Sequence, residues 1–261
     1  MSGRIYDTVL YNGEADVLEC RLTELDDQPV YRFVIVEANV DHRGRPKPQY
    51  YLEQKERFAP WADRIIHVTA DVGDPAPGES VWQQPAWERE HRQREATWQA
   101  LTDADPDDTV LHGDVDEIPA VVLTADIPHS YNQRMFYFAV DWEAPSWRGT
   151  VGTQVRWIDS FAALRESRTA VPALGTGWHL SWLGGPAAIQ AKLDATPHTE
   201  PSLQQFIRDG LANRALYEQG QLWGWTGLIV DHSVQLKAVD VDDDWPRWVH
   251  ERKCPASWFR P

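Results

Sequence analysis

Apolar and polar positions along the first 70 residues predict a strand, a helix and two further strands. Residues 6–11 form the first apolar strand, and Asn12-Gly13 provides a turn. Apolar residues then recur at helical spacing over residues 14–25, and the segment 26–29 closes that helix. The β-branched run 30–37 predicts a central parallel strand, and residues 64–69 predict a third strand. This strand–helix–strand order implies a right-handed crossover in a doubly wound sheet.

A loop over residues 71–85, rich in proline, glycine and aspartate, is long enough to be a mobile flap. The next segment predicts an amphipathic helix, with one stripe formed by Trp87, His91, Arg94, Trp98 and Leu101. An arginine on a buried stripe needs a partner. We expect Arg94 to meet the carboxylates at the end of the following strand; the alternative is a stem on apolar surface with its head in water.

The second half of the chain predicts strands and helices in mixed order. Strands are expected at 134–140 and 177–185, a hairpin or loop–strand unit at 151–157, and a late strand at 227–230. Helices are expected at 186–193 and 203–219. The aromatic C-terminal tail is expected to pack on the body. No linker separates the halves, so the sequence predicts a single domain over residues 1–261.

Composition narrows the class of protein. The chain has 42% hydrophobic and 25% charged residues, as in a globular protein. It contains no apolar run of the roughly 18 residues needed to span a bilayer and no apolar signal-peptide core, and its two cysteines lie far apart, so a cytoplasmic location is expected. A net charge of −15 argues against nucleic acid or an anionic membrane as a partner.

The most informative stretch is 109–119. A short apolar strand opens through Gly113 into three carboxylates, Asp114, Asp116 and Glu117, and Pro119 is expected to stop regular structure. Unpaired carboxylates are costly to bury, and the carboxyl ends of parallel strands bind ligands, so a divalent metal is a natural partner. A solvated acidic turn is the alternative.

A second polar group follows the strand 30–37. Glu37 at its end could accept hydrogen bonds from a ribose or base edge, or could pair with a loop arginine, and the sequence leaves both open. The loop 41–48 carries Arg43, Arg45 and Lys47, which are the nearest source of positive charge for phosphates.

The ordered set of motifs resembles glycosyltransferase family 17. The matching segments are 6–22, 33–37, 44–47, 87–94, 114–119 (Asp-Val-Asp-Glu-Ile-Pro), 177–181 (Gly-Trp-His-Leu-Ser) and 198–200 (His-Thr-Glu). The resemblance implies an α/β, GT-A-like fold: a Rossmann-like, doubly wound mixed sheet flanked by helices. It also implies a nucleotide-sugar donor, a divalent metal and inversion at the anomeric carbon. Residues 1–119 would form the nucleotide-sugar-binding half and residues 120–261 the acceptor-side half.

Roles follow from this resemblance. Asp116, with Asp114 directly or through water, would hold Mn²⁺ or Mg²⁺ against the diphosphate of a UDP-sugar, of which a GlcNAc-type donor is favoured. Positive charge for the diphosphate would come from Arg94, Arg43 and Lys47. Glu37 would bind the nucleoside, and Glu117 would pair with a nearby arginine.

Inversion in one displacement needs a general base. The candidates are Glu200, Glu143, Asp141, His179 and Asp231. We favour Glu200 as the base and His198 as a third metal ligand, because both lie in one predicted turn. Candidate stacking surfaces for the acceptor are Trp142, Trp178 and Trp182, each of which could instead be core.

The acceptor is open to a glycan, a small molecule or a peptide, because the chain lacks the membrane anchor and stem of animal members of the family, and Leu180 stands where a cysteine is common. Two other classes remain open from the sequence. One is a metal-dependent nucleotidyl- or phosphoryl-transfer enzyme, and the other is a non-catalytic carbohydrate-binding protein.

Overall fold

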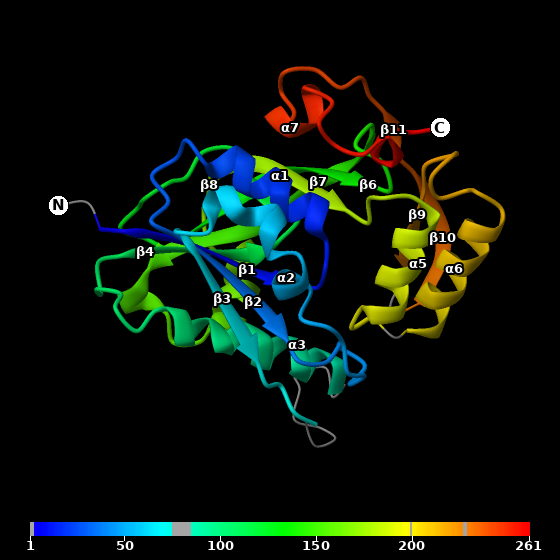
Figure 1. The fold of residues 1–261 in the computed structure, drawn as a ribbon. Coiled ribbons are helices and arrows are strands. Elements are labelled where there is room, and N and C mark those ends of the chain that lie inside the picture. The colour runs from blue at the N-terminus through cyan, green and yellow to red at the C-terminus, as the bar shows by residue number, and fades with distance from the viewer. Residues whose placement is uncertain (1–2, 75–84, 199, 227–228) are drawn as a thin grey trace.

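The computed structural model describes residues 3–74, 85–198, 200–226 and 229–261. The predicted strand–helix–strand opening is confirmed by β1 (Ile5–Tyr11), α1 (Ala15–Leu25) and β2 (Arg32–Ala38) (Figure 1). β3 (Ile65–Ala70) pairs in parallel with β2, and β4 (Thr109–Asp114) pairs in parallel with β1. The order β3-β2-β1-β4 therefore brings the carboxyl ends of these strands to one edge, where open α/β sheets bind ligands.

The second half of the chain continues this sheet. β7 (Trp142–Gln154) runs antiparallel to β4, and the order then continues through β6 (His129–Tyr137), β8 (Ala173–Ser181) and β5 (Glu117–Pro119). β11 (Lys237–Ala238) pairs with β7, which makes nine strands within the described residues. One mixed sheet thus runs through both halves, as predicted for a doubly wound α/β fold.

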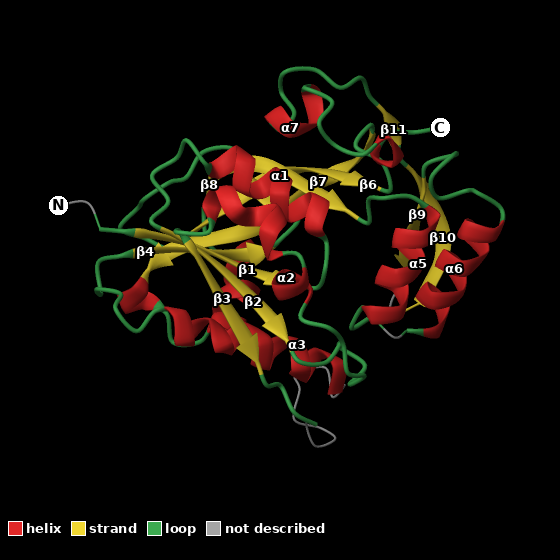
Figure 2. Ribbon diagram, in the orientation of Figure 1, coloured by secondary structure: helices red, strands yellow, loops and turns green. Residues whose placement is uncertain are grey.

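Helices cover both faces of the sheet (Figure 2). On one face lie α1, α2 (Tyr50–Glu53), α7 (Arg247–His250) and the 3₁₀ helices Lys55–Trp61 and Ala256–Trp258. On the other lie α3 (Pro85–Glu95), α4 (Phe161–Glu166) and the 3₁₀ helix Ala96–Ala100. Short 3₁₀ helices Val155–Trp157 and Ser167–Thr169 flank α4.

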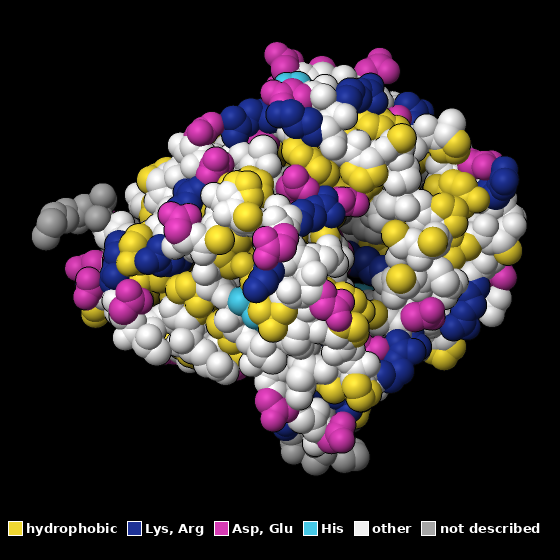
Figure 3. All heavy atoms as spheres, viewed as in Figure 1, with side chains coloured by type: hydrophobic (Ala, Val, Ile, Leu, Met, Phe, Trp, Pro, Cys, Tyr) yellow, Lys and Arg dark blue, Asp and Glu magenta, His cyan; other side chains and the backbone are white. Residues whose placement is uncertain are grey.

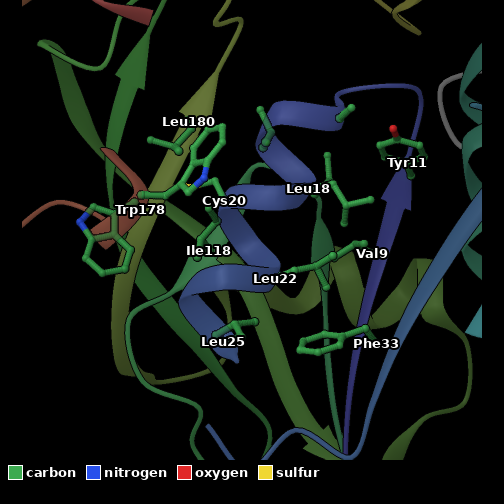
Figure 4. Close-up of a cluster of buried hydrophobic side chains, with 14 of the residues drawn as sticks. Val9, Tyr11, Leu18, Cys20, Leu22, Leu25, Phe33, Ile118, Trp178 and Leu180 are labelled. Carbon is green, nitrogen blue, oxygen red and sulfur yellow. The ribbon is translucent and has the colours of Figure 1, made fainter. Parts of the chain in front are cut away.

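The core on the α1 face combines residues from far apart in the sequence. Leu18 and Leu22 of α1 pack with Val9 of β1, Ile118 of β5 and Trp178 of β8 (Figure 4). The C-terminal tail joins the same core through Trp245, Trp248 and Trp258, which confirms the predicted packing of the aromatic tail on the body. Burial of such large side chains contributes about 1.5–3 kcal/mol each to stability.

A smaller unit lies beside the sheet. α5 (Pro186–Ala195) and α6 (Pro201–Ala212) pack with the antiparallel hairpin of β9 (Gln221–Thr226) and β10 (Ile229–Gln235), which forms its own two-stranded sheet (Figure 1). This α5–α6–hairpin unit shares a third core with Met135, Phe138 and Trp182 at the ends of β6 and β8.

Some element ends differ from the sequence prediction for a local reason. Phe138, at φ 67°, ends β6 before residue 140, and Trp182, at φ 58°, ends β8 before Gly185. Arg214, at φ 63°, follows the end of α6, which was predicted to reach residue 219. A positive φ is costly for residues other than glycine and interrupts regular hydrogen bonding.

Other differences concern whole segments. Pro119 ends regular structure as predicted, because it is the last residue of β5, a short strand that the sequence did not predict and that pairs with Gly177 through Pro119. The helical segment 50–61 was not predicted, and the segment 151–157 is the end of β7 followed by a 3₁₀ turn. Residues 75–84 of the predicted flap and residues 227–228 of the predicted late strand lie outside the described residues.

A buried ion pair links α1 to the sheet. The Arg21 guanidinium donates to both carboxylate oxygens of Asp7, at 2.8 and 2.6 Å, and to the main-chain oxygen of Glu117 at 2.5 Å. Both side chains are almost fully buried, at 0% and 2% exposure. Arg21 thereby fixes the start of β5 against β1.

We therefore expect Arg21→Met to lower the free energy of unfolding by about 3–5 kcal/mol, because Asp7 would be left buried without a counter-charge. Urea denaturation measures the change. The matched control is Arg208→Met, at an exposed position on α6, which should stay within about 0.5 kcal/mol of the wild type. Equal effects of the two substitutions would contradict the structural role of the buried pair.

Candidate active site

The turn between β4 and β5 points three carboxylates in different directions. Asp114 ends β4 and Glu117 begins β5, so Asp116 lies in the tight connection between them. The main-chain oxygen of Asp116 accepts from the Leu180 amide at 2.8 Å, and that of Glu117 accepts from the Thr150 hydroxyl at 2.8 Å. Neighbouring strands therefore hold the turn on both sides.

Glu117 is an internal anchor of this turn. Its carboxylate is 0% exposed and accepts two hydrogen bonds from Arg165 of α4, each 2.7 Å long, and one from the Trp147 indole at 2.6 Å. Gly113 and Gly149 leave room for it, since a Cβ atom at either position would lie within 3.1 Å of the Glu117 carboxylate. The interpretation of Glu117 as the partner of a nearby arginine is confirmed, and the arginine is Arg165.

Asp114 is held between two guanidiniums. One carboxylate oxygen accepts from Arg94 at 2.7 Å and the other accepts from Arg165 at 2.9 Å. Arg94 also pairs with Glu90 at 2.7 Å. The predicted partnership of Arg94 with the carboxylates after β4 is confirmed. Burial raises the pKa of Asp114, but Arg165 and Arg94 outweigh it and hold that pKa well below its usual range.

Asp116 meets a different pair of residues. Its carboxylate lies 3.0 Å from the Lys192 ammonium of α5 and 3.4 Å from Nε2 of His179 on β8. Burial raises the pKa of Asp116, but Lys192 and His179 lower it more, so the group is ionised at neutral pH. Lys192 and Arg165 were not identified from the sequence, because nothing in their local patterns points to residues 48–76 positions away.

These carboxylates open into a cavity of about 490 Å³ between the sheet edge and the α5–α6–hairpin unit. Lys and Arg side chains are visible in the hollow on that side of the molecule (Figure 3). The predicted site residues that line this cavity are Arg94, Asp114, Asp116, His179, His198 and Glu200, together with Trp182. The cavity also takes in cations that were not predicted, Arg165, Arg168 and Lys192.

Glu37 does not line the cavity and does not have a free carboxylate. It is 0% exposed and accepts from the amides of Tyr50 and Tyr51 and from the Lys47 ammonium, at 2.7, 3.1 and 2.9 Å. Its two oxygens therefore fix the first turn of α2. Glu37 and Lys47 were predicted to contact the donor; the structure pairs them with each other outside the cavity lining.

Arg43 is also placed elsewhere than predicted. Its guanidinium donates to the main-chain oxygen of Leu193 at 2.8 Å, and Arg45 donates to that of Asp194 at 2.7 Å. Both carbonyls lie at the C-terminal end of α5, where positive charge is favourable. Arg43 and Arg45 of the loop after β2 thus hold the end of α5 and do not line the cavity.

Three of the candidate bases lie outside the cavity lining. Glu143 pairs with Arg134 at 2.9 Å in a separate polar hollow, and Asp141 pairs with Arg260 at 2.9 Å. Asp231 contacts His232 at 2.7 Å on β10. Of the predicted stacking residues, Trp142 and Trp178 donate their indole N–H groups to main-chain oxygens and do not line the cavity.

His198 and Glu200 stay together at the rim of the cavity. Nδ1 of His198 lies 3.4 Å from Glu200, and its ring packs edge-on against Trp87. Among the described residues, one group of three potential metal ligands has its ligand atoms within 4.8 Å of one another. It consists of Asp242, Asp243 and Asp244. The structure therefore does not gather Asp114, Asp116 and His198 into one three-ligand cluster.

Two unsatisfied polar atoms mark the part of the cavity next to β1. The Tyr11 hydroxyl and Nδ1 of His42 are buried and have no hydrogen-bond partner among the described residues. Burial raises the pKa of Tyr11 and lowers that of His42, so both groups are neutral. Buried polar groups without partners are rare and are suited to a polar ligand.

The opposite part of the cavity is aromatic. Trp223 of β9 packs edge-on against Tyr137 at 5.3 Å and Trp182 at 5.8 Å between ring centroids, and all three line the cavity. Phe138 and Trp182 turn the chain with positive φ values at the ends of two adjacent strands here. Such strain is often found at binding sites.

An ionic cavity at the carboxyl end of parallel strands is suited to an enzyme that binds a phosphorylated ligand. The sequence comparison gives the family: a model of glycosyltransferase family 17 matches residues 1–200, and the chain belongs to that family. It is therefore a glycosyltransferase, and the nucleotidyl-transfer and carbohydrate-binding alternatives are set aside. No protein of curated function matches the chain.

Two solved structures are similar to the chain at low identity. A crystal structure of an active-site mutant of LgtC is 14% identical, with a TM-score of 0.32, over 66% of this chain and 66% of that one. The galactosyltransferase LgtC with donor and acceptor sugar analogues is 13% identical, with a TM-score of 0.32, over 80% and 82%. At these scores neither likeness carries an argument about the site. Among the described residues, no helix is both long and apolar enough to cross a membrane.

The buried His112 predicts a pH dependence of folding stability that can be tested. It is 0% exposed, and burial together with Arg94 and Arg165 holds its pKa well below the usual range, so it is neutral in the folded chain. Once the pH falls below about 6.5 the unfolded chain binds a proton there and the folded chain does not. Folding stability should therefore decrease as the pH falls from about 6.5 to 5, by up to about 1.4 kcal/mol per pH unit for this residue.

Urea denaturation across this pH range tests the expectation. His112→Gln should flatten the loss of stability relative to the wild type. The control His232→Gln, at a side chain that is 50% exposed, should keep the wild-type slope. An unchanged slope in His112→Gln would contradict a neutral, buried His112.

Proposed function

We propose that this chain transfers a sugar of the GlcNAc type from a UDP-sugar to a hydroxyl acceptor, with inversion and with a divalent metal. The observation that carries the proposal is the position of Asp114 and Asp116 in one cavity, between unsatisfied polar groups on one side and an aromatic wall on the other. The diphosphate would lie at the ionic centre, the nucleoside towards β1 and the acceptor towards Trp223.

The charge of the cavity supports a divalent metal. Among the described residues its lining has six carboxylates and four lysines or arginines: Glu14, Glu90, Asp114, Asp116, Glu166 and Glu200, against Arg94, Arg165, Arg168 and Lys192. A diphosphate adds further negative charge, and the chain as a whole carries −15. A bound divalent cation would offset that repulsion.

The residues around Asp116 fit part of a metal shell. One Asp116 oxygen and Nε2 of His179 lie 3.4 Å apart, close enough to bind one ion, whereas both Asp114 oxygens are engaged by arginines. Magnesium and manganese sites commonly use one or two protein ligands completed by substrate phosphates and water. We therefore assign Asp116 and His179 to the metal, with His179 in place of the His198 favoured from sequence. When bound, the ion would neutralise charge on the departing diphosphate.

The remaining chain groups have separate tasks. Arg94 and Arg165 hold Asp114 ionised, and Arg165 is itself fixed by Glu117, so two guanidiniums stand in fixed positions beside the proposed diphosphate position. The Tyr11 hydroxyl and His42 Nδ1 offer hydrogen bonds to the nucleoside in place of Glu37.

Glu200 remains our choice of general base. It lines the cavity with a side chain that is 27% exposed, and the hydrogen bond from His198 lowers its pKa, so it is ionised and able to accept a proton from the acceptor hydroxyl. The acceptor is a hydroxyl-bearing glycan, small molecule or peptide, of which a sugar fits the aromatic wall best.

Asp116→Asn is expected to remove both UDP-dependent Mn²⁺ binding and glycosyl transfer, with a rate at least roughly a hundredfold below wild type. Its fold should persist, because Lys192 is 30% exposed and can be solvated. The control Asp243→Asn lies in the exposed acidic run and should retain wild-type transfer. Transfer by Asp116→Asn at the wild-type rate and with the wild-type metal dependence would exclude the metal role.

Trp223→Ala tests the acceptor end. Loss of a stacking face should raise KM for a sugar acceptor roughly tenfold while the affinity for UDP stays unchanged, since one aromatic contact contributes about 0.5–1.5 kcal/mol beyond its area. Steady-state kinetics with varied acceptor and calorimetry with UDP separate the two effects. Trp157→Ala, at a tryptophan that is 57% exposed outside the cavity, serves as the control. A loss of UDP affinity in Trp223→Ala would reverse the assignment of the two ends.

A further inference from the structure

Lys192 forms an ion pair with Asp116, the carboxylate assigned above to the metal. Its ammonium lies 3.0 Å from one oxygen of Asp116 and 3.9 Å from Glu14. The other Asp116 oxygen faces His179, and Arg94 and Arg165 take both oxygens of Asp114. Each oxygen of the two aspartates thus has a partner from the chain itself.

We infer that Lys192 is a resident counter-ion of Asp116 that is displaced when donor and metal enter together, and that it then pairs with the donor diphosphate. This inference rests on the proposed function. A divalent ion at Asp116 would stand beside the ammonium and be repelled by it. The diphosphate removes that repulsion by giving the ammonium a new anionic partner. Metal binding should therefore be weak without the nucleotide and strong with it.

The Lys192 side chain is held by fewer hydrogen bonds than Arg165 and can therefore change partner more easily. Arg165 is fixed by two hydrogen bonds to Glu117 in addition to its bond to Asp114. Within the described residues the Lys192 ammonium makes one hydrogen bond, to Asp116. Its side chain is 30% exposed and lies along the Trp182 ring, with the ammonium 5.9 Å from the ring centroid. A lysine has a flexible stem and a compact charge that can change partner.

The backbone below Lys192 is held in place, so the exchange needs only the side chain. Arg43 and Arg45 bind the carbonyls of Leu193 and Asp194, the two residues that follow Lys192 on α5. The same contacts that remove Arg43 from the predicted donor site thus fix the base of the lysine. Arg43 and Arg45 position Lys192 within reach of both Asp116 and the cavity.

Binding energies must then be coupled in both directions. If UDP raises the affinity for Mn²⁺ by some factor, Mn²⁺ raises the affinity for UDP by the same factor. The charge on Lys192 is the proposed origin of much of this factor. Removing the charge should strengthen binding of the metal alone, weaken binding of UDP, and reduce the coupling.

The experiment titrates Mn²⁺ into the chelator-treated protein, with and without saturating UDP. It follows free Mn²⁺ by electron paramagnetic resonance and UDP binding by calorimetry. The wild type should bind Mn²⁺ at least tenfold more tightly with UDP. Lys192→Met should bind Mn²⁺ alone at least tenfold more tightly than the wild type and bind UDP more weakly. Lys192→Arg keeps the charge and should retain most of the coupling.

The matched control is Lys237→Met, at a lysine that is 77% exposed and lines another hollow, which should behave as the wild type. Equal Mn²⁺ affinity of Lys192→Met and wild type without UDP would overturn the inference while leaving the proposed function in place. Tight UDP binding in the presence of a chelator, lost in Lys192→Met, would overturn it in favour of a lysine that replaces the metal. Absence of UDP binding in every variant would overturn the proposed function itself, and the inference with it.

Discussion

The whole site depends on compensating one carboxylate that has no access to water. Glu117 is 0% exposed, and an unpaired charge there would cost several kcal/mol. Arg165 donates two parallel hydrogen bonds to Glu117 and a third to Asp114, so one guanidinium joins the buried carboxylate to a carboxylate that lines the cavity. Because α4 carries Arg165 and β4 carries Asp114, the helix on one face of the sheet fixes the geometry at its edge.

Other buried charges near the site are paired as well, and the exposure of the paired cation rises from Arg21 to Arg94 to Lys192. Arg21 and Asp7 are buried completely and act as structure. Arg94 links Asp114 to Glu90 at the cavity wall. The Lys192 ammonium, which is partly exposed, pairs with Asp116 through its single hydrogen bond among the described residues. Among these ion pairs, Lys192 is the most exposed cation, at 30% against 0% for Arg21 and 2% for Arg94.

Local pattern predicted much of the fold and the centre of the site. The periodicity of residues 6–37 and 87–101 and the carboxylates after β4 depend on neighbours in sequence, and Arg94 could be paired with them because it lies one element away. Arg165 and Lys192 could not be found in this way, since their contacts join residues 48–76 positions apart. Glu37 is an example of a local pattern that was misleading. A carboxylate at a strand end suggested a ligand contact, but this carboxylate accepts hydrogen bonds from the main-chain amides of α2.

The hairpin of β9 and β10 has a consequence for how such an enzyme can diversify. It forms its own two-stranded sheet, and the family match ends at residue 200, before the hairpin begins. Among the described residues, Trp223 therefore stands on a hairpin that shares no hydrogen-bonded strand with the sheet carrying Asp114 and Asp116. Exchange or reshaping of that hairpin would alter what the cavity accepts while the ionic centre keeps its supports, so a new specificity can arise without rebuilding the chemistry.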